Sequence, residues 1–165
     1  MKKMKKLFAM ATALTLVAAA FTGCGKKEDE TANTDNDGLK VGIVQYVSHP
    51  SLDNCYQGVE EELKEKYGDD ITIERQIGSD SSPDSDCATY ASQFAAKDYD
   101  MIIAIATPAA TSAFAAAEDK DIPVVFCAVS DPIGAGIAKS MEAPGYNCSG
   151  TSDVLDMAAQ VNVIK

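Results

Sequence analysis

Apolar runs and helical segments alternate along the chain from residue 39 onward, and this alternation most narrows the folds available to it. The runs are rich in aliphatic residues, as in strands covered on both faces; they span 39–47, 71–78, 101–107, 123–129 and, more weakly, 146–150. Helices are predicted at 51–67, 83–97 and 108–119, with another beginning at Asp153. This order predicts an α/β fold in three layers, a parallel sheet flanked by helices.

The first predicted helix has a clear apolar side. Apolar residues recur in it at three-and-four spacing, which predicts the face turned toward the sheet; they are Leu52, Cys55, Tyr56, Val59 and Leu63. The acidic run 60–62 falls on the opposite side, where we expect solvent. Gly68 is expected to end this helix.

Prolines mark the points where strands lead into helices. Four such points share this pattern: His49-Pro50, Ser82-Pro83, Thr107-Pro108 and Asp131-Pro132. Proline is tolerated in the first helical turn, and a preceding Ser, Thr or Asp caps the free amides. Because the carboxyl ends of parallel strands meet at one edge of a sheet, where open α/β sheets bind ligands, we predict a ligand site at this edge.

The segment 106–111 is the strongest single candidate at that edge. Here a buried strand leads directly into a helix start that is surrounded by alanines. The free amides and the partial positive charge of a helix N-terminus favour a carboxylate. The hydroxyl groups of Thr107 and Thr111 are expected to add hydrogen bonds.

Catalytic and cofactor motifs find little support in the sequence. The glycines Gly134 and Gly136 lack the preceding strand and following helix of a dinucleotide fingerprint. His49 is the only histidine, and although Cys55 lies near the same helix start, no third group is indicated that would orient the pair. No serine lies in a nucleophile-elbow pattern. We therefore expect a protein that is not an enzyme and needs no cofactor.

Charge and cysteine spacing exclude further classes. The chain carries a net charge of −11 and its only arginine is Arg75, so no basic patch for nucleic acid is expected. Four cysteines of the predicted domain lack C-x-x-C spacing, which argues against zinc and any other metal site; they are Cys55, Cys87, Cys127 and Cys148. They are interpreted as free thiols in preference to a disulfide.

The first 23 residues have the features of a bacterial lipoprotein signal peptide. Four lysines precede an apolar stretch, 7–21, that is short for a membrane span, and Thr22-Gly23 leads into Cys24. Cleavage before Cys24 would make this cysteine the lipidated N-terminus; the alternative is an ordinary secretory signal. Residues 24–38 are polar and are predicted to form a disordered tether. We therefore expect a lipid anchor on the extracytoplasmic side of the cell membrane.

Four segments in this order resemble the N-terminal lobe of ABC transporter substrate-binding lipoproteins of the tryptophan/tyrosine type. The segments are KVGIVQYVSHPSLDNCYQGV, IIAIATPAATSA, DIPVVFCAVSDPIGAG and GYNCSGTSD. The resemblance covers residues 39–165 and implies one lobe of a type I periplasmic binding protein fold, with strand order 2-1-3-4-5. In that family two lobes close on a small ligand, which is passed to a membrane permease driven by an ATPase.

By this resemblance, residues 39–152 form the ligand-binding lobe, and 153–165 begin a crossover helix toward a second lobe that the sequence does not contain. The implied function is capture of a small, amino-acid-like solute, such as an aromatic amino acid, for an ABC importer. The implied ligand-binding residues follow four strands: Gln45, Tyr46, His49 and Pro50; Thr107, Pro108, Ala109 and Ala110; Val129, Ser130, Asp131 and Pro132; and Thr151, Ser152 and Asp153.

Two other classes remain open at this point. A one-domain flavodoxin-like enzyme or sensor has the same strand and helix order, but Gln45 and Tyr46 stand where a phosphoacceptor domain needs acidic residues. A truncated surface lipoprotein that binds no ligand would leave an apolar face exposed around 154–164.

Overall fold

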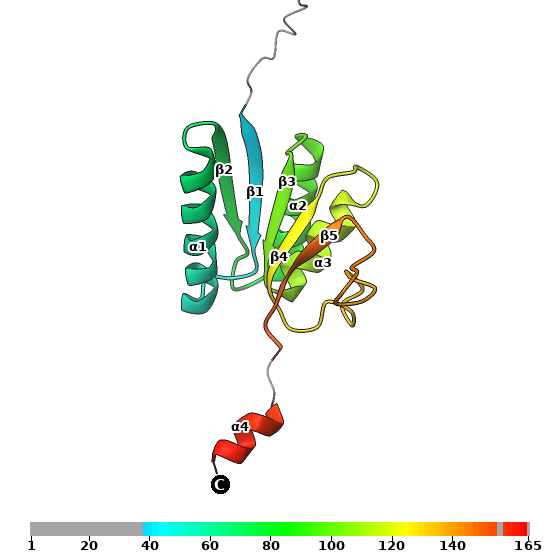
Figure 1. The fold of residues 1–165 in the computed structure, drawn as a ribbon. Helices are drawn as coiled ribbons and strands as arrows, with labels where there is room; N and C mark the ends of the chain where they lie inside the picture. Colours follow the sequence, from blue (N-terminus) through cyan, green and yellow to red (C-terminus); the bar gives the residue numbers. More distant parts are fainter. Residues whose placement is uncertain (1–37, 155–156, 165) are drawn as a thin grey trace, which may run out of the picture. The chain divides into compact units, whose positions relative to one another are not determined.

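Five parallel strands form one sheet in the order β2-β1-β3-β4-β5, which confirms the predicted order (Figure 1). The structure is a computed structural model that describes residues 38–154 and 157–164. The strands are β1 (Leu39–Gln45), β2 (Ile71–Ile77), β3 (Met101–Ile105), β4 (Val124–Val129) and β5 (Cys148–Ser152). The helices are α1 (Pro50–Tyr67), α2 (Pro83–Ala96), α3 (Thr107–Ala117) and α4 (Met157–Val163). The helix predicted from Asp153 therefore begins later, at Met157.

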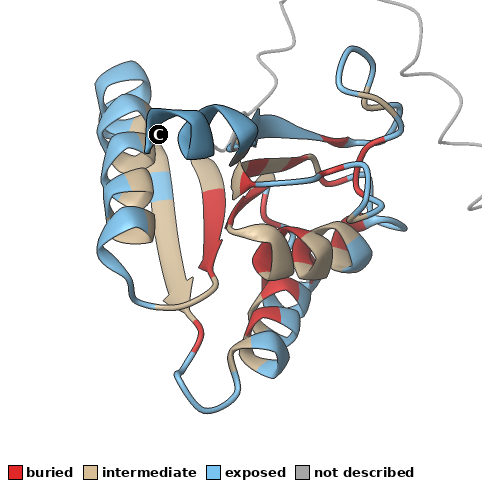
Figure 2. Ribbon diagram, turned by 90° about the horizontal axis from the view of Figure 1, so that it is seen from below, coloured by how far each residue is buried: buried red, intermediate tan, exposed pale blue. Residues whose placement is uncertain are grey.

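Helices cover both faces of the sheet, which gives the three predicted layers (Figure 2). On one face, α2 and α3 pack over a cluster that includes Phe94, Ile102, Ala113 and Phe126, all almost fully buried. The small alanines of α3 let this helix lie close to the sheet. This side of the sheet holds most of the buried residues.

Helix α1 covers the other face and contains no buried residue. Its apolar side packs against the buried residues Val41, Ile43, Ile103 and Ile105 of the two central strands. That side consists of the residues predicted from helical spacing, Leu52, Cys55, Tyr56, Val59 and Leu63, all of them half-buried. The predicted orientation of α1 is thus confirmed.

The helix starts agree with the proline pattern only in part. His49 caps α1, because its Nδ1 accepts a hydrogen bond from the Ser51 amide at 3.3 Å. Ser82 precedes α2 without capping it through its side chain, and Thr107 lies inside α3, whose N-cap is Ala106. The prediction of side-chain caps was wrong at these two positions.

The helix start predicted at Asp131-Pro132 was also wrong. A series of turns follows Pro132, and Asp131 Oδ1 accepts from the Gly134 amide at 2.8 Å. Gly136 then takes a positive φ of 76°, which breaks a right-handed helix. Here the Asp-Pro pair begins a turn, because the glycines that follow do not continue a helix.

The described residues contain no helix that is both long and apolar enough to cross a membrane. The predicted signal peptide, the lipidation site Cys24 and the predicted tether up to residue 37 lie outside the described residues.

Candidate ligand-binding edge

The segments after β1, β3, β4 and β5 lie side by side at the carboxyl edge of the sheet, as predicted. Backbone hydrogen bonds join each to the next. The Tyr46 amide donates to the Ile105 carbonyl at 3.2 Å, the Ala106 amide donates to the Cys127 carbonyl at 3.0 Å, and the Asp153 amide donates to the Val129 carbonyl at 3.2 Å. The four segments with predicted ligand contacts therefore form one continuous edge.

The junction of β3 and α3 has an unusual backbone. Ala106 takes φ 83° and ψ 156°, a region that only glycine enters without strain. No side chain caps the α3 N-terminus, and the first intrahelical bond runs from the Ala110 amide to the Ala106 carbonyl at 3.0 Å. An uncapped helix N-terminus, which carries a partial positive charge, therefore lies at this edge directly after a strained residue.

A second strained position lies at the end of the neighbouring strand. Ala128 has φ 55°, and the pairing of β4 with β5 shifts register between Phe126 and Val129. Such bulges redirect the chain at sheet rims and beside functional sites. Two adjacent strands thus end in left-handed alanines, which marks this edge as a place where backbone strain is retained.

The predicted ligand contacts divide by exposure. Five have buried side chains, so they are expected to contribute through their backbone or through packing: Gln45, Ala109, Ala110, Val129 and Pro132. The other ten are half-buried or exposed: Tyr46, His49, Pro50, Thr107, Pro108, Ser130, Asp131, Thr151, Ser152 and Asp153. The hydroxyl of Thr111, which was expected to reach a ligand, donates instead to the Pro108 carbonyl at 3.0 Å.

Sequence reasoning missed a polar network beneath this edge. Arg75 of β2 donates from Nη2 to Gln45 Oε1 at 2.6 Å and to Asp53 Oδ1 at 2.5 Å. Gln45 Nε2 also donates to Asp53 Oδ1, at 2.9 Å. The hydrogen bonds from Gln45 and Arg75 hold the pKa of Asp53 below its usual value. The only signal in the sequence was the single arginine.

The four described cysteines are free thiols, as predicted. Burial raises the pKa of the Cys87 thiol, beside Asp84 and Asp86, and that of the Cys148 thiol to about 11 each. Burial also raises the pKa of Cys127, which lies at the ligand edge. These three thiols therefore stay protonated at neutral pH and are poor nucleophiles.

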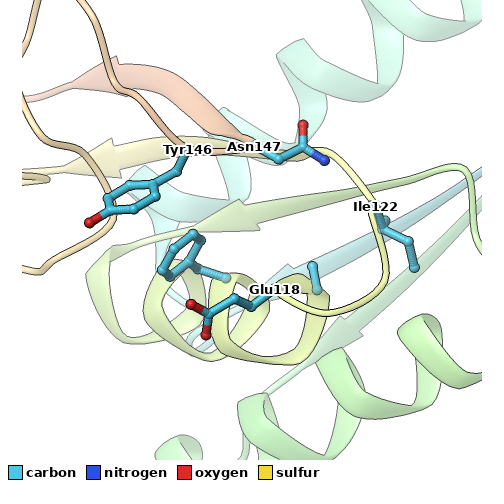
Figure 3. A pocket seen from close by; sticks show the side chains of 6 residues that line it. Glu118, Ile122, Tyr146 and Asn147 are labelled. Carbon is cyan, nitrogen blue, oxygen red and sulfur yellow. The ribbon is translucent and has the colours of Figure 1, made fainter.

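Figure 3 shows an apolar pocket that the sequence analysis did not single out. Its volume is about 110 Å³, and it is lined by Phe114, Ala117, Glu118, Ile122, Tyr146 and Asn147. Asn147 directly precedes β5, and Ile122 lies two residues before the start of β4. The pocket therefore lies at the amino ends of these two strands, away from the carboxyl edge. It contains none of the predicted ligand contacts. Among the described residues, no group of three or more His, Cys, Asp or Glu side chains is arranged to hold a metal ion.

Similar proteins share both the sequence and the fold of this chain. It is 38% identical over 174 residues to a tyrosine-binding protein of Clostridioides difficile. A domain from Streptococcus pneumonia, solved in complex with L-Trp, is 38% identical and superposes with a TM-score of 0.71 over 78% of this chain. A ligand-free, open substrate-binding protein with adhesive properties from Clostridium difficile is 39% identical, with a TM-score of 0.69 over 76% of this chain.

The match to the tyrosine-binding protein spans the whole of this chain, but each match covers only part of the relative. This chain covers 49% of the tyrosine-binding protein, 43% of the Streptococcus structure and 42% of the Clostridium difficile structure, so the chain spans about half the length of these relatives. The family model described as ABC transporter substrate binding protein matches residues 40–165. The chain therefore belongs to the family of ABC transporter substrate-binding proteins.

Proposed function

We propose that this chain captures an amino acid, with aromatic amino acids as the first candidates, for an ABC importer. The observation that carries this proposal is the uncapped start of α3 behind the strained Ala106, at an edge joined to the three neighbouring segments. Relatives described with tyrosine and with L-Trp support the ligand class. The captured solute would be delivered to a membrane permease with its ATPase.

The exposed groups at this edge suit both charged ends of an amino acid. The α3 amides and the Thr107 hydroxyl would hold the carboxylate, together with Ser130. Asp131 or Asp153, both exposed, would face the ammonium group. The half-buried ring of Tyr46 offers a surface on which an aromatic side chain would pack.

Thr107→Val tests the carboxylate site. Thr107 is half-buried and valine keeps its shape, so we expect weaker binding of L-tyrosine and L-tryptophan with an unchanged melting temperature. Calorimetric titration of the protein as its host produces it, purified in detergent, measures the affinity. Thr89→Val is the matched control, because Thr89 lies exposed on α2 and its hydroxyl donates to the Ser85 carbonyl. Equal affinities of both variants would remove Thr107 from the site.

We further propose that Cys24 carries a lipid anchor that holds the binding domain outside the cell membrane. The support is the sequence alone: lysines, a short apolar stretch and a cysteine after Thr22-Gly23. Labelled palmitate supplied to the host should be incorporated into the wild-type protein and not into Cys24→Ala. Equal labelling of both proteins would contradict the anchor and leave the ligand proposal standing.

A further inference from the structure

The loop 46–49 between β1 and α1 carries two predicted ligand contacts, Tyr46 and His49. Its ends are fixed by the backbone: the Tyr46 amide bonds to β3, and the Asp53 amide donates to the His49 carbonyl at 2.8 Å. Between these ends, the Val47 carbonyl accepts a hydrogen bond from Gln45 Nε2 at 2.8 Å. The position of the Gln45 side chain therefore helps to decide where the loop lies.

Gln45 has no freedom to turn without losing hydrogen bonds. Its side chain is fully buried, and it is the one buried polar residue of the described part of the chain. Its amide nitrogen donates to Val47 and Asp53, and its amide oxygen accepts from Arg75. A buried amide that loses such partners carries an unpaired polar atom, which is costly.

Arg75 orients this amide from the neighbouring strand. One nitrogen, Nη2, serves both Gln45 and Asp53, and the guanidinium carbon lies 3.9 Å from the centre of the Tyr56 ring. The side chain is 21% exposed, and its buried Nε has no hydrogen-bond partner in the described part of the chain. Arg75 is thus fixed between β2 and α1 in spite of an unsatisfied donor.

We infer that Arg75 is a positioning residue for ligand binding: through Gln45 it holds the loop 46–49 in the conformation that presents Tyr46 and His49. The ligand meant here is the amino acid of the proposed function, on which this inference rests. Arg75 itself need not touch the ligand, because its contacts run to Gln45, Asp53 and the Tyr56 ring.

The test compares Arg75→Met with Lys64→Met in the protein as its host produces it. Lys64 is exposed and forms another ion pair of α1, with Glu60 at 2.8 Å. Glu60 also hydrogen-bonds to Tyr56, but in the described part of the chain neither Lys64 nor Glu60 bonds to Gln45, Asp53 or the loop 46–49. Two quantities are measured without and with ligand, respectively: hydrogen exchange of the Tyr46, Ser51 and Asp53 amides, which are hydrogen-bonded at the two ends of the loop, and calorimetric affinity for L-tyrosine and L-tryptophan. Arg75→Lys, which keeps a donor and the charge, tests for rescue. Gln45→Met serves as a second variant if Arg75→Met fails to fold.

For Arg75→Met we expect exchange at these three loop amides to rise, and affinity to fall, each by about tenfold, the fold-change of one lost charge-assisted hydrogen bond. Lys64→Met should change neither quantity, and Arg75→Lys should lie between. Wild-type exchange at the loop in Arg75→Met, or in Gln45→Met, would overturn the inference. A wild-type protein that binds neither amino acid contradicts the proposed function, while the exchange measurement still decides on Arg75.

Discussion

The Ala106 amide donates to the Cys127 carbonyl at 3.0 Å, and this bond joins the strained start of α3 to the strand segment beside the left-handed Ala128. Ala106 and Ala128 both take positive φ values, which residues with a Cβ rarely adopt. Both lie where adjacent strands reach the predicted ligand edge. The presence of two strained residues on adjacent strands suggests that strain is retained at this edge because it shapes the backbone that faces a ligand.

Ala106→Gly is expected to stabilise the protein. Removing the Cβ relieves a strain of about 1–3 kcal/mol, against an entropic cost of about 0.5–1 kcal/mol, so the free energy of unfolding should rise by about 1 kcal/mol. Urea denaturation measures this change. The control is Ala88→Gly in the exposed middle of α2, where the same substitution should destabilise by about 1 kcal/mol. A loss of stability in both variants would show that Ala106 is unstrained.

Tyr99→Phe is expected to reduce both stability and its dependence on pH. The Tyr99 hydroxyl hydrogen-bonds to Glu74, which lowers the pKa of Glu74, while burial raises the pKa of Tyr99 to about 12. Because the pKa of Glu74 is lowered in the folded protein, Glu74 stabilises the fold at pH values above its ordinary pKa of 4.5, and this stabilisation is lost as pH falls below that value. Because the pKa of Tyr99 is raised, Tyr99 stabilises the fold below pH 10, and this stabilisation is lost as pH rises toward 12.

The loss at pH 7 should be about 1.5–3 kcal/mol, the value of a hydrogen bond to a charged group. Denaturation curves of wild type and Tyr99→Phe, recorded from pH 3 to pH 7 (roughly the range over which carboxylates titrate), check the prediction. Parallel stability curves across this range would contradict the coupling between Glu74 and Tyr99.

Gly42→Ala is expected to destabilise the protein by about 1–3 kcal/mol. A Cβ at Gly42 would lie 2.5 Å from the ring of Phe94, which is 1% exposed and has no room to move. Gly58→Ala provides the contrast, since nothing lies within 4 Å of a Cβ on that exposed residue of α1, and there alanine should stabilise by about 0.8 kcal/mol. Thermal melts of both variants measure the effects; equal melting temperatures would refute this packing.

The cysteines should react with iodoacetamide in an order set by burial. Cys87 and Cys148 are 0% and 2% exposed with pKa values of about 11, so both should stay unmodified at pH 7.5 (about three units below these pKa values) until the protein unfolds. Of the four described cysteines, we expect the half-buried Cys55 to react first, since burial raises the pKa of Cys127, which is also half-buried. Peptide mass spectrometry after timed labelling measures the order, and early labelling of Cys148 would contradict the packing of β5.

Much of the fold could be predicted because strand and helix patterns are local. The aliphatic run of β3 and the spaced apolar residues of α1 each indicate their element without knowledge of the rest. The turn after Asp131 was missed because Asp-Pro begins helices and turns alike, and only the later glycines decide between them.

The candidate site could be predicted as an edge but not as a set of contacts. Parallel strands bring their carboxyl ends together whatever the side chains are. The burial of Gln45, and its bond to Arg75 thirty residues away, depends on the register that pairs Ile43 with Arg75, which no local pattern contains. The positive φ of Ala106 likewise depends on its tertiary hydrogen bond to Cys127.

Hydrogen exchange with and without L-tyrosine, on the protein as its host produces it, tests the central claim most directly. We expect the amino acid to protect the amides of 46–49, 106–110, 129–131 and 151–153, apart from Pro108, which has no amide hydrogen. These are the four segments of the carboxyl edge. Protection confined to the pocket around Phe114 and Tyr146, or no protection by L-tyrosine or L-tryptophan at saturating concentration, would contradict it.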